Sequence, residues 1–505
     1  MIHPVALMVD TPKVELSPQS QQLLRCTMLL TLGQVTSYGL SFIRNVILAR
    51  MLTKVDFGLA AMFGMTLSLL EVSGRMSFGQ QIIQSKDGNA ESFQATSHTF
   101  QFMLSVIGAF LVAALSHPLA YAFKVPHFAW AFSLLAFVPL ARGFENLDYF
   151  RQQRELNYLP VVLCELVPQT VVTLAAWPLA VWLGDFRVII WVMLSKAALG
   201  ILMTQWLAKR SYRWAWRRDY MKVMWIFGWP LLLNGLLMFA SQQADQVIVG
   251  AFLSLNELAP YALVLSLVSI PWFVFGQVGS SILLPILSRI QDDPERFRWK
   301  YRAGVECAGV GAVVLMLPLI IAGEQLVTIL FGPKYVGTGT LMALLGAAAA
   351  VRFLRFVPSV AAMARADTMN QLYSNTCRSL GLPLAFAVAA LGGGVNLIAA
   401  CALLAELVAS GFSVSQLRRR QGVPLRDTAG AAIYVLCFVT VGLVTVYLGA
   451  SHWSVWLAAV ATLTMLAFSI GIAWISFPNL ARLVQSAIAG KRITSIPNPA
   501  LDSIL

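Results

Sequence analysis

The sequence predicts an all-α integral membrane protein, and its composition and apolar pattern are the observations behind this class. Hydrophobic residues make up 58% of the 505 residues, charged residues make up 12%, and the mean hydropathy is +0.72. Soluble domains average about 45–50% apolar and about 25% charged residues. Apolar segments, each near the roughly 20 residues that a membrane-spanning helix needs, follow one another along most of the chain. The connections leave no room for a soluble catalytic domain, so we do not expect an enzyme.

Fourteen spans joined by short turns account for this pattern. The tightest turns fall at Gly184 and at 392–394, where glycines interrupt the apolar run. The predicted spans are 26–49, 57–83, 96–118, 128–150, 159–183, 187–208, 223–250, 259–288, 303–330, 340–364, 371–391, 395–417, 429–449 and 453–477.

The N-terminal segment 1–25 is predicted to be a polar tail rather than a targeting signal. It contains Pro4, Pro12 and Pro18 and lacks the apolar core of a cleavable signal peptide. We therefore expect the first span to remain as an anchor.

The distribution of the net charge of +13 predicts an orientation in the membrane. With the N-terminus placed inside, most of the 36 Lys and Arg residues fall in the inner loops and the two tails. This is the positive-inside bias, so both termini are expected to be cytoplasmic. The opposite side holds Arg50, Lys54, Lys124, Arg187 and Lys334.

The densest basic stretch is 209–222, which carries Trp214 and Trp216 among its cations. Such a mixture is typical of a topology and headgroup anchor at the membrane surface. An RNA-binding patch is the alternative. Because the positive charge follows the loops of one side, we expect membrane lipids and no nucleic acid as partners.

An internal repeat predicts two pseudo-symmetric lobes. The segment 45–60 aligns without gaps on 246–261, and both copies join the end of an outward-running span to the next span. The copies lie an even number of spans apart, so the two units share one orientation, as in transporters with parallel repeats. Chance similarity between apolar segments is the alternative. The predicted organisation is a cytoplasmic tail (1–25), an N-lobe (26–208), a basic linker (209–222), a C-lobe (223–417), a basic loop (418–428), two further spans (429–477) and a cytoplasmic tail (478–505).

Seven basic residues lie inside predicted spans. A cation in hydrocarbon costs at least about 2.5–3.5 kcal/mol on insertion scales, so such residues normally face a bundle interior or a water-filled cavity. Together they predict a central cationic cavity that favours an anionic passenger. They are Arg44, Arg75, Arg142, Lys196, Arg352, Arg355 and Arg378.

Four segments resemble one known family. They are ILARMLTKVDFGLAAM at 47–62, FGQQIIQSKD at 78–87, RGFENLDYFRQQRELNY at 142–158 and QADQVIVGAFLSLNELAPYAL at 243–263. Their order and spacing are similar to those of the polysaccharide transporter (oligosaccharide flippase) family, within the multidrug/oligosaccharidyl-lipid/polysaccharide exporter superfamily.

This resemblance implies a bacterial inner-membrane flippase. Such a protein moves polyprenyl-diphosphate-linked oligosaccharide units by alternating access between two lobes, for exopolysaccharide or O-antigen synthesis. It also implies a polysaccharide polymerase and export machinery as further partners.

The central cations are the candidates for holding the diphosphate. Arg352 and Arg355 are three residues apart and share a helix face, with no acid nearby in their span. Lys196 and Arg378 are also without a local acid. The planar fork of Arg suits the bidentate, charge-assisted bonds that phosphate oxygens accept. The alternative pairs these cations with Glu165, Glu306 or Glu406 as structural bridges.

Other candidates have local partners. Glu71 and Arg75 form an i,i+4 pair with the acid first, the favourable order on a helix. Arg142 shares a face with Glu145 and Asp148 near the cytoplasmic end of the fourth span. We carry both arginines as substrate-contacting candidates, with a structural role as the alternative.

The seventh span adds a polar face. Asn234 and Gln242 are expected to bond sugar hydroxyls, or alternatively to bind neighbouring helices. The repeat also equates Arg44 with Asp245, which carries the opposite charge. We predict that this pair closes the outer gate, with satisfaction of each residue inside its own lobe as the alternative.

The driving force is expected to be an ion gradient or the membrane potential. The phosphate-loop motif GxxxxGK[ST] is absent, and neither Cys nor His residues have metal-site spacing, so no resident cofactor is expected. Buried carboxylates can titrate near neutrality, which makes Glu165, Glu306 and Glu406 candidate H⁺ or Na⁺ sites.

Three other functions are alternatives. A multidrug/cation antiporter should favour acids over bases inside the membrane, the reverse of this pattern. A peptidoglycan-precursor flippase suits fourteen spans, although the quoted segments resemble the polysaccharide branch more. A membrane glycosyltransferase or polymerase is disfavoured because the predicted outer loops are only a few residues long.

Overall fold

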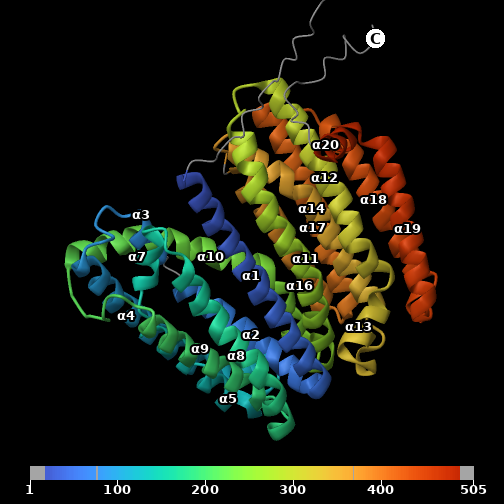
Figure 1. Ribbon diagram of the computed structural model, residues 1–505. Helices are drawn as coiled ribbons and strands as arrows, with labels where there is room; N and C mark the ends of the chain where they lie inside the picture. The colour runs from blue at the N-terminus through green and yellow to red at the C-terminus, as the bar shows by residue number, and fades with distance from the viewer. Residues whose placement is uncertain (1–17, 75–77, 368, 489–505) are drawn as a thin grey trace, which may run out of the picture.

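The computed structural model describes residues 18–74, 78–367 and 369–488, and within these ranges the regular secondary structure is helical (Figure 1). The N-terminal part contains α1 (Pro18–Met51), α2 (Lys54–Gly74), α3 (Phe78–Gln84), α4 (Glu91–Ala122), η1 (Pro126–Phe128), α5 (Ala129–Leu134), α6 (Phe137–Arg142), α7 (Asp148–Arg154), α8 (Leu159–Leu183) and α9 (Arg187–Trp206).

The C-terminal part begins after the linker that follows α9. It contains α10 (Arg218–Phe252), α11 (Leu255–Ser288), α12 (Pro294–Ile321), α13 (Gly323–Phe331), η2 (Pro333–Tyr335), α14 (Gly339–Ala364), α15 (Met369–Ser379), α16 (Gly381–Ala390), α17 (Val395–Gln421), α18 (Arg426–Tyr447), η3 (Ala450–His452), α19 (Val455–Ser476) and α20 (Pro478–Ile488).

Ten of the helices in the described part are long and apolar enough to cross a membrane. They are α4, α8, α9, α10, α11, α12, α14, α17, α18 and α19. The protein is therefore a multi-pass, all-α membrane protein. The count of fourteen spans stays a prediction, since α1 and α2 are not among these ten and two predicted spans are divided into short helices.

Both divisions coincide with prolines. The predicted span 128–150 is split into α5, α6 and α7, and 371–391 is split into α15 and α16. Pro139 lies just after the break between α5 and α6, and Pro383 lies just after the break between α15 and α16. A proline has no N–H, so it cannot donate a hydrogen bond to the carbonyl four residues earlier. Before Pro139, Val138 N–H donates to Leu135 O at 3.0 Å, which is the shorter i→i+3 pattern. The predicted span 303–330 is also divided, into α12 and α13.

The helices form two groups with α1 between them in Figure 1, where α3–α9 lie on the left and α12–α19 on the right. Helix α10 packs on both groups, against α2 and α4 on one side and α16 on the other. The final helices α18 and α19 pack on α12, on the outside of the second group. The surface between the groups is therefore built mainly from α1, α2, α10 and α11.

Candidate functional site

A polar cavity of about 590 Å³ lies between the two groups. Side chains of α1, α2, α6, α8 and α9 line it from the N-terminal part, and side chains of α10, α11, α14 and α15 line it from the C-terminal part. Because each of these helices belongs to a predicted span, the cavity lies among the spans.

Five of the seven cations predicted inside spans line this cavity. The acids on its wall are Glu145, Glu165 and Asp245, so basic residues outnumber acidic ones. Arg355 lies behind the wall, and Arg75 with its partner Glu71 lies outside the residues whose side chains are described. The lining cations are Arg44, Arg142, Lys196, Arg352 and Arg378.

Uncharged polar groups and apolar side chains make up the rest of the lining. Gln242 lies on the wall, as the sequence predicted for a sugar-contacting candidate. Asn234, the other candidate on α10, is exposed and is not a lining residue; its amide contacts Met238 Sδ at 3.9 Å. Two helical turns separate Asn234 from Gln242, which is enough to remove it from the cavity. The neutral polar lining residues are Ser41, Asn45, Ser68, Gln242, Gln243, Gln246, Ser266 and Ser269.

Three arginines converge on the carboxylate of Glu406, which is 1% exposed. Arg352 Nε lies 2.8 Å and Arg378 Nε 2.7 Å from Glu406 Oε1. Arg355 Nη2 lies 3.5 Å from Glu406 Oε2. The pairing with Glu406 that the sequence left open as an alternative is therefore formed. One carboxylate cannot neutralise three guanidinium groups, and Asp245, which acts electrostatically on Arg378 from the same wall, offsets the excess only in part, so the cluster keeps an excess of positive charge.

Arg355 differs from the other two arginines in its surroundings. Its Nη1 donates to Asn375 Oδ1 at 2.8 Å and to Ser374 Oγ at 3.3 Å, and the side chain does not line the cavity. Arg352 and Arg378 do line it. Of the predicted diphosphate residues in the C-terminal part, these two are the ones that a ligand in the cavity can touch.

Lys196 has a partner of its own. Its Nζ donates to Glu165 Oε1 at 3.0 Å, and the same oxygen accepts from Ser37 Oγ at 3.2 Å. Arg44 also interacts electrostatically with Glu165. Lys196 therefore has no acid in its own span, but it pairs with Glu165 of the neighbouring helix α8.

Glu306 belongs to another part of the molecule. On α12 it pairs with Arg302 at 3.2 Å and accepts hydrogen bonds from Asn479 Nδ2 and Leu480 N–H at the start of α20. It does not line the cavity. Its prediction as an ion-coupling site in the transport path has no support from this placement, because its carboxylate anchors the last helix.

The predicted gate pair is not formed in this conformation. Arg44 and Asp245 both line the cavity, but no ion pair joins them in the described residues. Asp245 Oδ2 instead accepts from the Tyr261 hydroxyl at 2.8 Å. The two halves bring both residues to one cavity. Asp245 bonds Tyr261, and Arg44 interacts electrostatically with Glu165, each within its own half.

A different set of cations joins the two parts at the predicted outer side. Arg50 Nε donates to Leu330 O at 2.7 Å and its Nη2 also bonds Ile329 O, so Arg50 caps the end of α13. Lys334 in turn bonds the end of α1, where it donates to Arg50 O at 3.1 Å and to Leu52 O. Cations suit the carbonyl-bearing ends of helices.

A third cation repeats this arrangement between α4 and α10. Lys124, which follows α4, donates to Phe252 O at the end of α10 at 3.1 Å. We call Arg50, Lys124 and Lys334 the outer latch, because each joins the two halves. The sequence predicts only that they lie on the outer side. The available signal was their position near helix ends: Arg50 is in the last turn of α1, Lys124 follows α4 and Lys334 follows α13.

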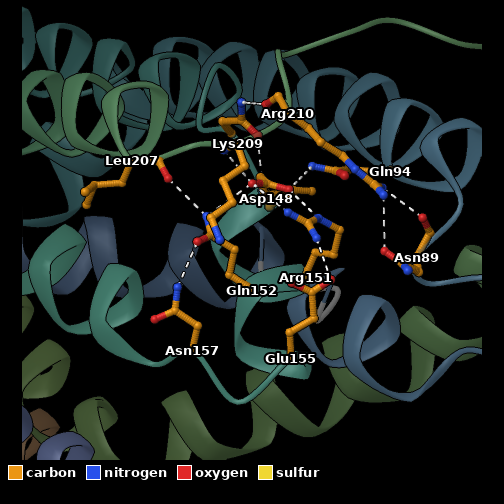
Figure 2. Close-up of polar contacts among 12 residues, drawn as sticks. Asn89, Gln94, Asp148, Arg151, Gln152, Glu155, Asn157, Leu207, Lys209 and Arg210 are labelled. Carbon is orange, nitrogen blue, oxygen red and sulfur yellow. Dashed lines mark hydrogen bonds and ion pairs between the residues drawn. The ribbon is translucent and has the colours of Figure 1, made fainter.

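The face predicted for Arg142, Glu145 and Asp148 is divided by the structure. Arg142 and Glu145 line the cavity, whereas Asp148 is fully buried away from it and pairs with Arg151 at 2.6 Å. Figure 2 shows Asp148 at the centre of a network with Arg151, Gln152 and Lys209. The hydrogen bond to Asp148 is the main reason that the pKa of Arg151 is raised.

This network holds the linker between the two halves. Lys209 N–H donates to Asp148 Oδ2 at 2.8 Å, Gln152 Nε2 to Leu207 O at 3.0 Å and Asn146 Nδ2 to Arg210 O at 2.8 Å (Figure 2 draws the first two). The segment 142–158, which carried part of the family resemblance, therefore fixes the backbone that leads into α10.

A central cavity between two groups of spans, in which basic side chains outnumber acidic ones, is the arrangement of a membrane transporter. Solved structures share this fold. The chain is similar to the lipid II flippase MurJ in an inward closed conformation, with a TM-score of 0.69 and 12% identity, covering 88% of this chain and 99% of that one. It is also similar to an inward-facing MATE family multidrug transporter, with a TM-score of 0.62 and 12% identity over 77% and 94% of the two chains.

Sequence comparison identifies the family. A family model described as "Polysaccharide biosynthesis protein" matches residues 47–338, more than half of the chain, so the chain belongs to this family of transporters. The amylovoran biosynthesis protein AmsL of Erwinia amylovora is 22% identical over 63% of this chain and 83% of its own length. The lipopolysaccharide biosynthesis protein WzxC of Escherichia coli is 21% identical over 60% of this chain and 62% of its own length.

Proposed function

We propose that this protein translocates polyprenyl-diphosphate-linked oligosaccharide units across the bacterial inner membrane, for exopolysaccharide or O-antigen synthesis. The observation that carries the proposal is the excess positive charge of the arginine cluster at the cavity wall. Arg352, Arg355 and Arg378 share the single carboxylate of Glu406. Uncompensated cations among apolar spans are costly, and an anionic ligand relieves that cost.

A diphosphate matches the donors that this wall offers. Arginine forks make short, charge-assisted bonds to phosphate oxygens. The cavity volume of about 590 Å³ is within the range of about 300–1,000 Å³ usual for small-molecule sites, and thus accommodates a diphosphate with the first sugars. Neutral side chains such as Gln242, Ser266 and Ser269 supply donors and acceptors for sugar hydroxyls. The polyprenyl tail stays in the lipid.

The outer latch supports transport by alternating access. With the orientation given by the positive-inside rule, Arg50, Lys124 and Lys334 lie on the periplasmic side. Their bonds to helix-end carbonyls hold the two halves together there. Breaking them opens the cavity outward. Glu165 is our candidate for ion coupling. Of the three acids predicted for that role, Glu165 lines the cavity, whereas Glu306 and Glu406 do not.

A peptidoglycan-precursor flippase is the second candidate. The fold likeness to the lipid II flippase MurJ favours it. The two candidates share a diphosphate-binding wall and differ in the glycan, so the arginine cluster does not separate them.

Reconstituted flipping tests the proposal. Purified protein in proteoliposomes receives a fluorescent polyprenyl-diphosphate oligosaccharide or lipid II, under a pH or a sodium gradient. We expect the oligosaccharide lipid to be moved, lipid II to be moved more slowly, and Arg352→Ala to reduce movement at least tenfold. Movement of neither lipid under any gradient, or equal movement by Arg352→Ala, contradicts the proposal.

A further inference from the structure

The two cavity-lining arginines of the C-terminal part reach Glu406 through the same atom. Arg352 Nε and Arg378 Nε lie 2.8 Å and 2.7 Å from Glu406 Oε1. Among the described residues, no other hydrogen bond or ion pair engages these two guanidinium groups. The Nη1 and Nη2 groups, which form the outer edge of each planar fork, therefore stay available at the cavity wall.

Each of these arginines is also restricted by a second contact. The Arg352 guanidinium lies 5.8 Å from the centre of the Trp272 ring, a cation–π contact that favours one side-chain orientation. Arg378 is brought to Glu406 by the close approach of α16 to α17, since a Cβ on Gly381 would lie 2.5 Å from Ala405 Cβ. The backbone thus supports the position from which Arg378 meets the carboxylate.

Glu406 is not arranged as a simple neutralising partner. Its Oε2 is buried without a hydrogen-bond partner, and the contact with Arg355 at 3.5 Å is only an ion pair. Glu165, by comparison, meets one lysine and one serine on a single oxygen. Glu165 forms one ion pair, with Lys196, and interacts electrostatically with Arg44, whereas three arginines contact Glu406.

We propose that Glu406 is a positioning residue, which turns the outer edges of Arg352 and Arg378 toward one diphosphate and so gives the cavity its preference for that group over other anions. This inference rests on the function proposed above. It replaces, for Glu406, the ion-coupling role expected from the sequence. With both Nε groups held on one oxygen, the two forks are fixed relative to each other, which is the preorganisation that distinguishes a diphosphate from a single tetrahedral anion.

Anion binding to the purified full chain tests this inference. Sodium pyrophosphate and sodium sulfate are titrated by calorimetry at constant ionic strength, and the ratio of their dissociation constants is the readout. Wild type should prefer pyrophosphate. Glu406→Gln should reduce that preference about tenfold, the equivalent of one charge-assisted hydrogen bond, because the amide keeps the shape but no longer fixes both Nε groups.

The chain offers a matched control in Glu306→Gln, which also removes one buried carboxylate paired with an arginine, but outside the cavity. That variant should leave the pyrophosphate-to-sulfate ratio unchanged. Gly381→Ala provides a second variant in case Glu406→Gln does not fold. It displaces Arg378 without changing any charge, and the same decrease in preference is expected.

The outcomes separate the inference from the proposed function. An unchanged ratio in Glu406→Gln and Gly381→Ala, or an equal gain for both anions in Glu406→Gln, overturns the positioning role while pyrophosphate still binds. If the double variant Arg352→Ala/Arg378→Ala binds pyrophosphate as wild type does, the arginine site itself is wrong, and with it the main support for the proposed function.

Discussion

The two halves of the molecule place charge at the cavity in different ways. In the N-terminal part, Lys196 faces one acid, Glu165, and the two side chains are 33% and 57% exposed. In the C-terminal part, three arginines surround Glu406, which is 1% exposed. The first arrangement is exposed and shares one acid between Lys196 and Arg44, whereas the second is buried and shares one acid among three arginines. Under the proposed function, the C-terminal wall binds the anion and the N-terminal wall adapts around it.

Removal of the acid from each wall in turn should produce the largest difference, a difference in the free energy of unfolding. Glu406→Ala removes the carboxylate that three guanidinium groups share and should destabilise the protein by about 3–5 kcal/mol, the usual cost of breaking a buried pair. Glu165→Ala breaks an exposed pair and should cost at most about 1 kcal/mol. Thermal unfolding of both purified variants in one detergent measures this. Equal losses would remove the distinction between the two walls.

Removal of a cation from each wall should affect the rate of transport unequally, as removal of an acid from each wall should affect stability unequally. Arg378→Ala should slow flipping at least tenfold, which corresponds to about 1.4 kcal/mol and is within the value of one charged hydrogen bond. Lys196→Ala should slow it by about threefold, because a hydrated pair contributes less. Initial rates in proteoliposomes provide the comparison. A greater effect of Lys196→Ala would reverse the assignment of the two walls.

Two glycines test how tightly each wall is packed. A Cβ at Gly381 meets Ala405 at 2.5 Å, whereas at Gly200 it meets Glu145 Oε1 at 3.9 Å, an ordinary contact. Gly381→Ala should therefore cost about 1–3 kcal/mol from overpacking. Gly200→Ala should be neutral or stabilise by up to about 1 kcal/mol, through helix propensity. Unfolding midpoints measure both, and a neutral Gly381→Ala would show that α16 can shift without loss.

The smallest effect is expected at the outer latch, where both halves meet. Arg50→Gln removes bonds to two exposed carbonyls, and should favour outer opening by about 1 kcal/mol. Arg187→Gln is the control, because Arg187 pairs at 3.1 Å with Asp185 in its own loop. Labelling of a cysteine placed on the cavity wall, in a cysteine-free background, reports the opening from outside. Equal labelling of the two variants would exclude a latch role for Arg50.

Much of the membrane architecture could be predicted from sequence. Helix α8 has the predicted bounds 159–183, because Pro160 suits the first helical turn and Gly184 adopts a left-handed φ of +67° at its end. The breaks near Pro139 and Leu380 were missed. Proline is tolerated inside membrane helices, so its presence does not predict whether a span is kinked or divided.

The site was predictable only in its charge. The apolar surroundings of Arg352 and Arg378 identified them as cavity candidates, since a cation there needs a polar environment. The choice among Glu165, Glu306 and Glu406 as partners needed the packing of α14, α15 and α17, which the sequence pattern does not encode. The latch was missed because its acceptors are backbone carbonyls, which every residue carries.

A structure with bound ligand tests the central claim most directly. Cryo-electron microscopy of the protein in nanodiscs with a polyprenyl-diphosphate oligosaccharide should show the diphosphate at the cavity wall, bonded to the Nη groups of Arg352 and Arg378 while their Nε groups stay on Glu406. A diphosphate bound elsewhere, such as at the basic linker 209–222, with both arginines engaged only by Glu406, would contradict the account.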